Sequence, residues 1–275
     1  MKIRLIIIAI LSTVLVGCSG EFNKVLKHGD FDYRYEYAKQ CFAEGSFSHA
    51  ETLLQDLITL KKGSETGEEA LYMLAMSQYM NGDYESASAT FKKYYTSYPK
   101  GLYAEHAMYY VGQALYESAP EPRLDQTPTI GAINAYQQFM DLFPNSALRS
   151  NAQSRLYELQ EKLVMKELLS AQLYYNLGGY FGNVNSNSES NYSSSIIVAQ
   201  NALKNYPYSD HREEFALLIM KSKFELAQNS SDDRKLERYQ DAEDECYGFL
   251  NEYPDSKEKP LAVKYIAKCK KITKN

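Results

Sequence analysis

Small and large apolar residues recur along this chain at helical spacing, and one arrangement of five positions occurs twice. In it, two small residues flank a turn signal, a Gly followed two residues later by an aromatic ring, and a large apolar residue comes last. The first copy is Ala38, Gly45, Phe47, Ala50 and Leu54, and the second, 37 residues later, is Ala75, Gly82, Tyr84, Ala87 and Phe91. Small side chains let two helices cross closely, and Gly adopts backbone angles that end a helix. The pattern therefore predicts repeated helix–turn–helix units.

Four aromatic–proline pairs mark where the second helix of a unit ends. They are Tyr98-Pro99, Phe143-Pro144, Tyr206-Pro207 and Tyr253-Pro254. Pro has no backbone N–H and cannot extend the helix before it, so each pair predicts a boundary. Counting back from each Pro, at the spacing of Ala87 and Phe91, predicts the core positions of the later units: Ala132/Tyr136, Ser195/Ala199 and Ala242/Cys246.

These units resemble tetratricopeptide repeats, which implies an all-α, right-handed superhelical solenoid over residues 31–275. We expect about five helix pairs followed by a C-terminal capping helix. The expected bounds are 31–62, 68–100, 103–145, 164–208 and 212–255 for the pairs, and 257–272 for the cap. An Asn/Ser-rich stretch at 183–195 predicts a loop inserted into the fourth pair, which is either a plain mobile loop or a lid or docking loop.

The first eighteen residues carry the signals of an exported, lipid-modified protein. Basic residues at 2 and 4 precede an uncharged apolar run of 12 residues, 5–16, which is too short for a membrane span and typical of a signal peptide. Residues 15–18, Leu-Val-Gly-Cys, resemble a bacterial lipobox. We therefore expect a signal peptide at 1–17 and acyl chains, palmitate among them, on Cys18. The alternative is an ordinary signal peptide followed by a chance cysteine.

The residue after Cys18 indicates which bacterial membrane anchors the chain. Ser19 is not the Asp that marks retention in the inner membrane in enteric lipoproteins. We therefore expect a lipid anchor at the periplasmic face of the outer membrane, where two or more acyl chains hold a protein stably. Residues 18–30 are mostly polar and predict a flexible tether.

Composition and charge narrow the function classes. The 275 residues carry a formal charge of −5, which argues against nucleic acid because binding to its backbone needs a clustered positive face. The four His are far apart and lack zinc-ligand spacing. The sequence contains no Gly-rich phosphate loop, GxSxG turn or HExxH helix. We expect neither enzyme activity nor a cofactor or metal.

Tyrosine is the abundant aromatic residue, with 25 Tyr and no Trp. Aromatic residues fall three positions before, or four after, the first small residue of several units, on one helix face. Members of this predicted ladder are Tyr35, Phe42, Tyr72, Tyr79, Tyr109, Tyr116 and Tyr175. Tyr offers a large contact area with few rotors to freeze and a hydroxyl for peptide groups, so a concave peptide-binding groove is one interpretation. The other is that these rings pack against each other or a neighbouring helix.

The cysteines left after Cys18 fall at core positions. Cys41 and Cys246 occupy repeat positions and are expected as buried thiols. A disulfide between Cys246 and Cys269 is an open alternative in an oxidising compartment.

Four further stretches make the likeness to a known family more specific. Residues 124–139, Leu-Asp-Gln-Thr-Pro-Thr-Ile-Gly-Ala-Ile-Asn-Ala-Tyr-Gln-Gln-Phe, are followed by Phe-Pro-Asn-Ser at 143–146. Together with residues 155–167 and Tyr174-Tyr175, they resemble the BamD family of outer-membrane assembly lipoproteins, whose Arg-Asp-Gln-Thr stretch is here interrupted by Leu124 after Arg123. The Asn/Ser-rich insert departs from the family's compact repeat.

That resemblance implies a non-catalytic scaffold of the β-barrel assembly machine. Its N-terminal repeats would engage unfolded outer-membrane protein precursors. Its C-terminal repeats would dock on the POTRA domains of the barrel-forming partner, with Arg212 as the docking candidate, although a surface Arg without such a role is equally compatible with the sequence.

Two other classes of function stay open. One is a periplasmic tetratricopeptide adaptor for peptidoglycan or envelope-constriction machinery. The other is a glycan-binding lipoprotein or a repeat-bearing hydrolase, which the absence of Trp and of an evident carboxylate pocket disfavours.

Overall fold

The computed structural model describes residues 20–27, 29–60, 64–178 and 190–274. These ranges contain helices, turns and loops and no strand, which confirms the all-α prediction. The predicted signal peptide 1–17, the lipid site Cys18 and residues 183–189 lie outside the described residues. Residues 191–195, predicted as the end of an inserted loop, instead begin a helix, because Ser190 caps it by accepting a hydrogen bond from Tyr192 N. The helices are, in order, α2 (Phe31–Ala43), α3 (Phe47–Leu60), α4 (Glu65–Met80), α5 (Tyr84–Ser97), α6 (Ala104–Ser118), α7 (Thr127–Leu142), α8 (Arg149–Leu177), α9 (Asn191–Asn205), α10 (Arg212–Gln228), α11 (Asp232–Glu252) and α12 (Lys259–Thr273).

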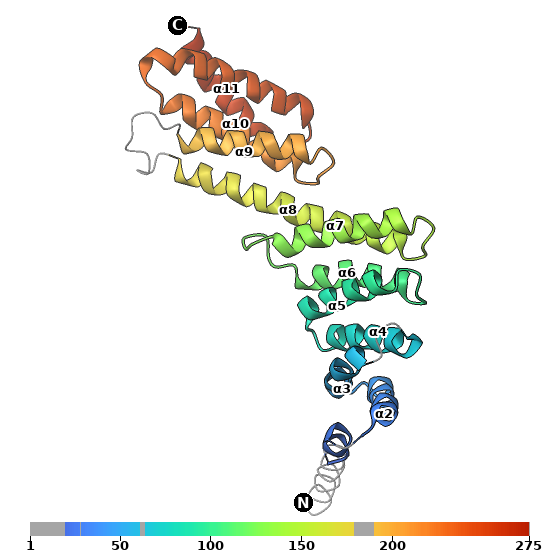
Figure 1. Ribbon diagram of the computed structural model, residues 1–275. Coiled ribbons are helices and arrows are strands. Elements are labelled where there is room, and N and C mark those ends of the chain that lie inside the picture. Colours follow the sequence, from blue (N-terminus) through green and yellow to red (C-terminus); the bar gives the residue numbers. More distant parts are fainter. Residues whose placement is uncertain (1–19, 28, 61–63, 179–189, 275) are drawn as a thin grey trace, which may run out of the picture. The chain divides into compact units, whose positions relative to one another are not determined.

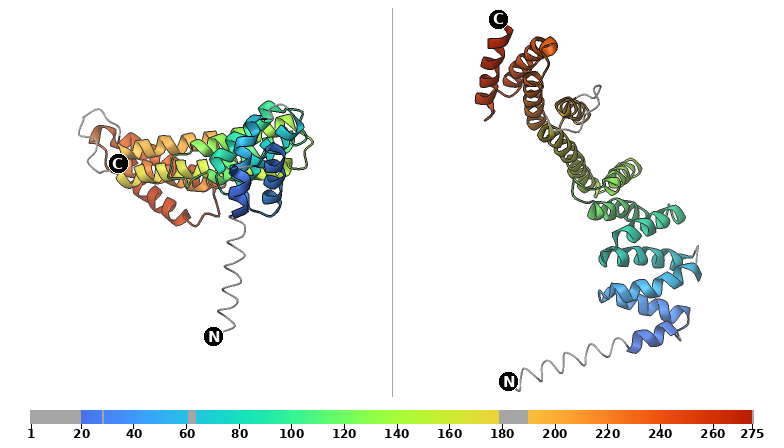
Figure 2. Two further views of the ribbon diagram at one scale, coloured as in Figure 1. Left: turned by 60° about the horizontal axis from the view of Figure 1, so that its bottom comes forward. Right: turned by 90° about the vertical axis from the view of Figure 1, so that its left-hand side faces the viewer.

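The chain divides into two compact units. The first consists of Met1–Pro120 and Gln126–Leu159, and the second of Glu121–Asp125 and Gln160–Asn275. In the first unit, each helix from α2 to α7 packs against the next (Figure 1). In the second, α9, α10, α11 and α12 pack against each other in the same consecutive way (Figure 2). Each unit is thus a stack of tetratricopeptide-like helix pairs.

The repeated small and large apolar positions form the cores of these pairs. Ala38, Ala75, Ala50 and Ala87 are fully buried, as are Leu54 and Phe91. Gly45 and Gly82 follow α2 and α4 with φ of +78° and +80°, which a residue with a Cβ adopts only at a cost. The structure therefore confirms the predicted roles of these repeat positions.

The aromatic–proline pairs end helices where the sequence predicts it. Helices α5, α7, α9 and α11 all end at the residue before the aromatic member of a pair. In every case the N–H of the aromatic residue still donates to the carbonyl four residues earlier, and Pro then prevents another turn. The core residues counted back from these prolines are all fully buried: Ala132, Tyr136, Ser195, Ala199, Ala242 and Cys246.

In three helix pairs, a glutamate in the first helix forms a hydrogen bond with the turn that follows the second helix. Glu68 Oε1 in α4 accepts hydrogen bonds from Tyr94 Oη at 2.5 Å and from Leu102 N at 2.8 Å, in the turn after α5. The same role falls to Glu105, bonded to Ser146 Oγ at 2.5 Å, and to Glu161, bonded to Ser209 Oγ at 3.0 Å. Each bond joins the two ends of one helix pair, so it fixes how the pair closes.

The structure corrects two predicted boundaries. Residues 20–27, which lie within the predicted tether 18–30, are helical, and Val25 is only 1% exposed because it packs on the cluster of α2, α3 and α4. The fourth helix pair begins at Arg149 rather than 164. The chain from Arg149 to Leu177 contains no Gly or Pro, so nothing interrupts the helix between them. As a result α8 runs from the first unit into the second.

Within the described ranges, no helix combines the length and the apolar composition that crossing a bilayer would require.

Candidate functional site

The seven aromatic residues of the predicted ladder differ in exposure. Tyr35 and Tyr109 are buried, at 7% and 8% exposure, so their rings are not available to line an open groove. The other five are half-buried: Phe42, Tyr72, Tyr79, Tyr116 and Tyr175. Six of the seven belong to the first unit, and Tyr175 belongs to the second.

In the N-terminal hairpins the rings mainly hold helices together. Tyr35 Oη donates to Glu69 Oε2 at 2.5 Å, which ties α2 to α4. The ring of Tyr72 stacks on Tyr103 with centroids 4.2 Å apart and meets Tyr94 edge-on. Burial raises the pKa of Tyr72 to about 12. For these residues the packing interpretation accounts for the contacts, because each ring is engaged by its neighbours.

A different arrangement surrounds Gln113, in the middle of α6. Its Oε1 accepts hydrogen bonds from Tyr136 Oη at 2.8 Å and from Tyr109 Oη at 3.2 Å, and its Nε2 donates to Glu117 Oε1 at 2.8 Å. Tyr79 of α4 adjoins the same cluster, where burial and the nearby Glu117 raise its pKa although a hydrogen bond with Gln113 opposes them. Gln113 thus gathers hydroxyls from three helices.

One turn further along α6, Tyr116 forms a second polar group with α8. Tyr116 Oη donates to Glu158 Oε2 at 2.5 Å and accepts from Arg155 Nη1 at 2.8 Å. The Arg155 guanidinium lies 4.4 Å from the centre of the Tyr116 ring, and Arg155 also bonds Glu158 at 3.0 Å. Burial and the Glu158 carboxylate raise the pKa of Tyr116, so its hydroxyl stays protonated at neutral pH.

We call this surface of the first unit the Gln113 face: Tyr79, Gln113, Tyr116, Glu117, Arg155 and Glu158. It combines half-buried aromatic rings with amide, carboxylate and guanidinium groups, which can bind both the side chains and the backbone of a peptide. Sequence reasoning found its two tyrosines and missed its four other members. A signal was present, because Gln113 lies four residues after Tyr109 and four before Glu117, on one helix face.

The remaining candidates lie in the second unit. Arg212, at the start of α10, pairs with Glu252 at 3.0 Å and donates to the carbonyl of Pro207 at 3.3 Å. Its guanidinium therefore already binds a carboxylate of its own chain. Tyr175 meets Tyr192 edge-on with centroids 6.0 Å apart, and so packs α8 against α9.

Cys246 and Cys269 lie in one hydrophobic cluster of α10, α11 and α12, and no disulfide joins them. Burial raises the pKa of the Cys246 thiol to about 12 and that of Cys269 to about 11, so both stay protonated at neutral pH. They are packing residues of the core. In the parts of the chain that the structure describes, no three His, Cys, Asp or Glu residues come together as metal ligands would.

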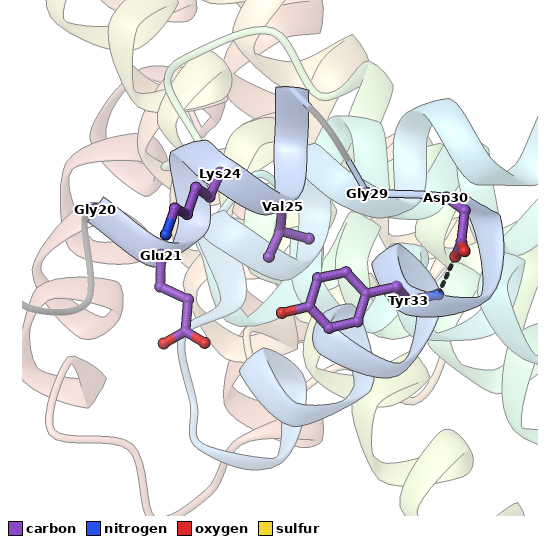
Figure 3. A pocket seen from close by; sticks show the side chains of 7 residues that line it. All are labelled: Gly20, Glu21, Lys24, Val25, Gly29, Asp30 and Tyr33. Carbon is purple, nitrogen blue, oxygen red and sulfur yellow. Dashed lines mark hydrogen bonds between the residues drawn. The ribbon is translucent and has the colours of Figure 1, made fainter.

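A broad recess of about 880 Å³ lies beside residues 20–27 and the start of α2 (Figure 3). Asp30 Oδ1 caps α2 there by accepting a hydrogen bond from Tyr33 N at 2.8 Å. Glu21, Lys24 and Tyr33 at its rim are exposed. The recess is open to solvent and brings together no set of groups that would select a ligand.

Comparison with known proteins places the chain in a family. A family model described as outer membrane lipoprotein, YfiO, matches residues 30–189. The chain is 20% identical over 167 residues to the outer membrane protein assembly factor BamD of Caulobacter vibrioides. This alignment covers 60% of this chain and 55% of that protein. It is 23% identical over 185 residues to the outer membrane protein assembly factor BamD of Xylella fastidiosa, in an alignment that covers 63% of each chain. The chain thus aligns with less than two thirds of the length of these relatives.

Among solved structures, the TPR2AB domain of yeast Sti1, described as a pHSP90 complex, aligns with 87% of this chain and 98% of its own, at a TM-score of 0.38 and 12% identity. The family model is the stronger finding, because it spans more than half of the 275 residues. This chain belongs to the YfiO family of outer membrane lipoproteins.

Proposed function

We propose that the chain is a non-catalytic scaffold of the β-barrel assembly machine, which assists the folding and insertion of outer-membrane proteins. The observation that carries the proposal is the family match over residues 30–189, and the relatives that the chain resembles are outer membrane protein assembly factors. The predicted lipobox supports an anchor at Cys18 on the periplasmic face of the outer membrane. Changing Cys18 to Ser should move the chain from the membrane fraction to the soluble envelope fraction.

For the first unit, the proposal is that the Gln113 face binds unfolded barrel precursors. Strands of barrel proteins alternate apolar with polar side chains, carry aromatic residues near the membrane interfaces and, before they pair, have free backbone N–H and carbonyl groups. The half-buried rings of Tyr79 and Tyr116 suit the side chains. The carboxylates of Glu117 and Glu158 can accept hydrogen bonds from peptide N–H groups, and Arg155 can donate to carbonyls.

For the second unit, the proposal is docking on POTRA domains of the barrel-forming partner. Arg212 is the candidate from the sequence, and its side chain retains 34% exposure while it pairs with the 52% exposed Glu252. An exposed ion pair of this kind contributes little to stability, so a partner carboxylate can replace Glu252 at small cost.

Co-purification tests the cellular role. The full-length chain, tagged at its C-terminus and solubilised from the envelope in detergent, should retain a barrel protein with POTRA domains, identified by mass spectrometry. Recovery of peptidoglycan-binding or constriction proteins without such a barrel protein would contradict the proposal and favour the adaptor function.

Peptide binding tests the Gln113 face. A fluorescent peptide that spans one β-hairpin of an outer-membrane barrel should bind the full chain, and the double variant Tyr79→Ser/Tyr116→Ser should weaken binding by roughly tenfold, since aromatic anchors often dominate such contacts. Tyr208→Ser is a matched control, because Tyr208 is 90% exposed and lies in the second unit. Equal binding by the double variant and the control, with unchanged circular dichroism, would rule out this face.

A further inference from the structure

The second unit contains an apolar groove that the proposed function leaves unused. A recess of about 470 Å³ is lined by Pro122 and Arg123 and by one side of α8, from Lys166 to Asn176. A second recess of about 270 Å³ continues between α8 and α10. Leu169 and Gln172 line both recesses, so the two form one surface, which we call the α8 groove.

The floor of the α8 groove is made of leucines. Lys166, Leu169, Leu173 and Asn176 follow each other at intervals of three or four residues, which places them on one face of the helix. Leu173 is 56% exposed and lines the recess, so it presents apolar surface to an occupant of the groove. On the side of α10 the floor continues with Leu217 and Leu218.

Three cations border this floor, and none of them has an acidic partner in the described part of the chain. Arg123, Lys166 and Lys221 line the two recesses, and no salt bridge or hydrogen bond involves their side chains there. One carboxylate lines the groove, that of Glu214, and its Oε2 lies 2.9 Å from His211 Nδ1. In a chain with five more acidic than basic residues, three unmatched cations around one apolar floor are a local excess of positive charge.

We propose that the α8 groove binds an acidic amphipathic segment of a partner protein. Its apolar side chains would cover Leu169 and Leu173, and its carboxylates would pair with Arg123, Lys166 and Lys221. Charge complementarity selects this occupant, because an uncharged apolar segment would leave the three cations unmatched at the rim. The inference concerns a surface apart from the Gln113 face and does not depend on the assembly role.

Fluorescence anisotropy with a designed probe tests the groove. The full-length chain in detergent is titrated into a labelled peptide of sequence EELLQELLEE. The charge reversal Arg123→Glu/Lys166→Glu should raise the Kd roughly tenfold or more, because two attractions become repulsions. Leu173→Ser should raise it by roughly threefold or more, and its exposed position lets the variant fold.

The matched control is Lys257→Glu/Lys264→Glu, which makes the same change in net charge on two exposed lysines away from the groove. It should leave the Kd within roughly twofold of the unchanged chain, and about 0.5 M salt should weaken binding generally. Failure of the unchanged chain to bind the peptide, or equal weakening by both charge reversals, would overturn the proposal. Groove-dependent binding to vesicles of anionic lipid without binding to the peptide would overturn it as well, since the groove would then be a lipid site.

Discussion

At the scale of single residues, close packing at helix crossings sets the limits on substitution. Gly112 occupies in the third pair the position that Ala38 and Ala75 occupy in the first two. A Cβ built there would lie 2.8 Å from Tyr136 Cδ1 and 2.9 Å from Tyr136 Cε1. The Tyr136 ring is fully buried, and its hydroxyl is bonded to Gln113, so the ring has little freedom to move. The crossing of α6 and α7 therefore requires Gly.

Replacing Gly112 by Ala should destabilise the first unit by about 1–3 kcal/mol, because the added methyl overpacks the crossing. Urea unfolding followed by circular dichroism measures the change. Gly131→Ala is a matched control in the adjacent helix α7, since a Cβ there meets Leu115 Cδ1 at an ordinary 3.4 Å. It should be neutral or stabilise by up to about 1 kcal/mol through the better helix propensity of Ala. The explanation fails if Gly112→Ala is as stable as Gly131→Ala.

At the scale of helix pairs, ion pairs between partly buried side chains join neighbouring helices in addition to their apolar packing. In the second unit, Lys223 of α10 lies 2.8 Å from both Asp241 and Glu245 of α11. Burial lowers the pKa of Lys223, but the hydrogen bonds to the two carboxylates outweigh burial and leave its pKa raised. Asp241 and Glu245 thus contribute to the contact between α10 and α11.

Replacing Lys223 by Met should destabilise the second unit by about 1–2 kcal/mol, because two carboxylates that are partly desolvated lose their counter-ion. Lys235→Met is the control, because Lys235 forms a weak ion pair, with 4.0 Å between its Nζ and Oδ1 of the fully exposed Asp232. This substitution should change stability by less than about 0.5 kcal/mol. Because the pKa of Lys223 is raised, its contribution is present at neutral pH and is lost as the pH rises through that pKa. Equal unfolding midpoints for the two variants at neutral pH would refute the assignment.

At the scale of the whole molecule, the burial of tyrosines makes the stability of both units depend on pH in the alkaline range. Burial raises the pKa of Tyr72 in the first unit, and of Tyr253 and Tyr265 in the second, to about 12 in each case. For Tyr35, Tyr94 and Tyr136 the pKa is also raised by burial. The unfolded chain releases these protons near pH 10. Between about pH 10 and 12 the folded state therefore binds more protons than the unfolded state, and its stability falls as the pH rises.

The urea midpoint should accordingly stay level up to about pH 9 and fall steeply above about pH 10. The tyrosinate absorbance should rise together with the loss of circular dichroism, because the buried hydroxyls ionise when the chain unfolds. Ionisation of most tyrosines with the helical signal intact would show that they are accessible in the folded state.

Much of the architecture follows from local rules that a sequence displays. Ala38 and Ala75, Gly45 and Gly82, and the aromatic–proline pairs are recognisable because helix crossing, a positive φ and helix termination each demand particular residue types. The two misplaced boundaries arose where such signals were weak. The mostly polar residues around Val25 gave no sign that it is buried. The stretch from Arg149 to Leu177 contains no helix-breaking residue that would have marked where the fourth pair begins.

The candidate sites depended more on the fold. Helical spacing placed Tyr35 and Tyr116 on one predicted face, but only the packed helices made the first buried and the second half-buried. Gln113 meets Tyr136 across 23 positions, and Tyr116 meets Arg155 across 39. Periodicity describes one helix at a time and carries no information about which side chains of two helices will touch.

The sequence alone therefore determined the helix pairs, their turns and the small residues at their crossings, since these depend on backbone sterics and spacing within a short stretch of chain. Only the tertiary structure decided which tyrosines remain accessible, that Arg212 already holds Glu252, and that three cations surround the leucines of α8. Exposure and charge pairing depend on the distances between helices, and those distances exist only once the chain has folded.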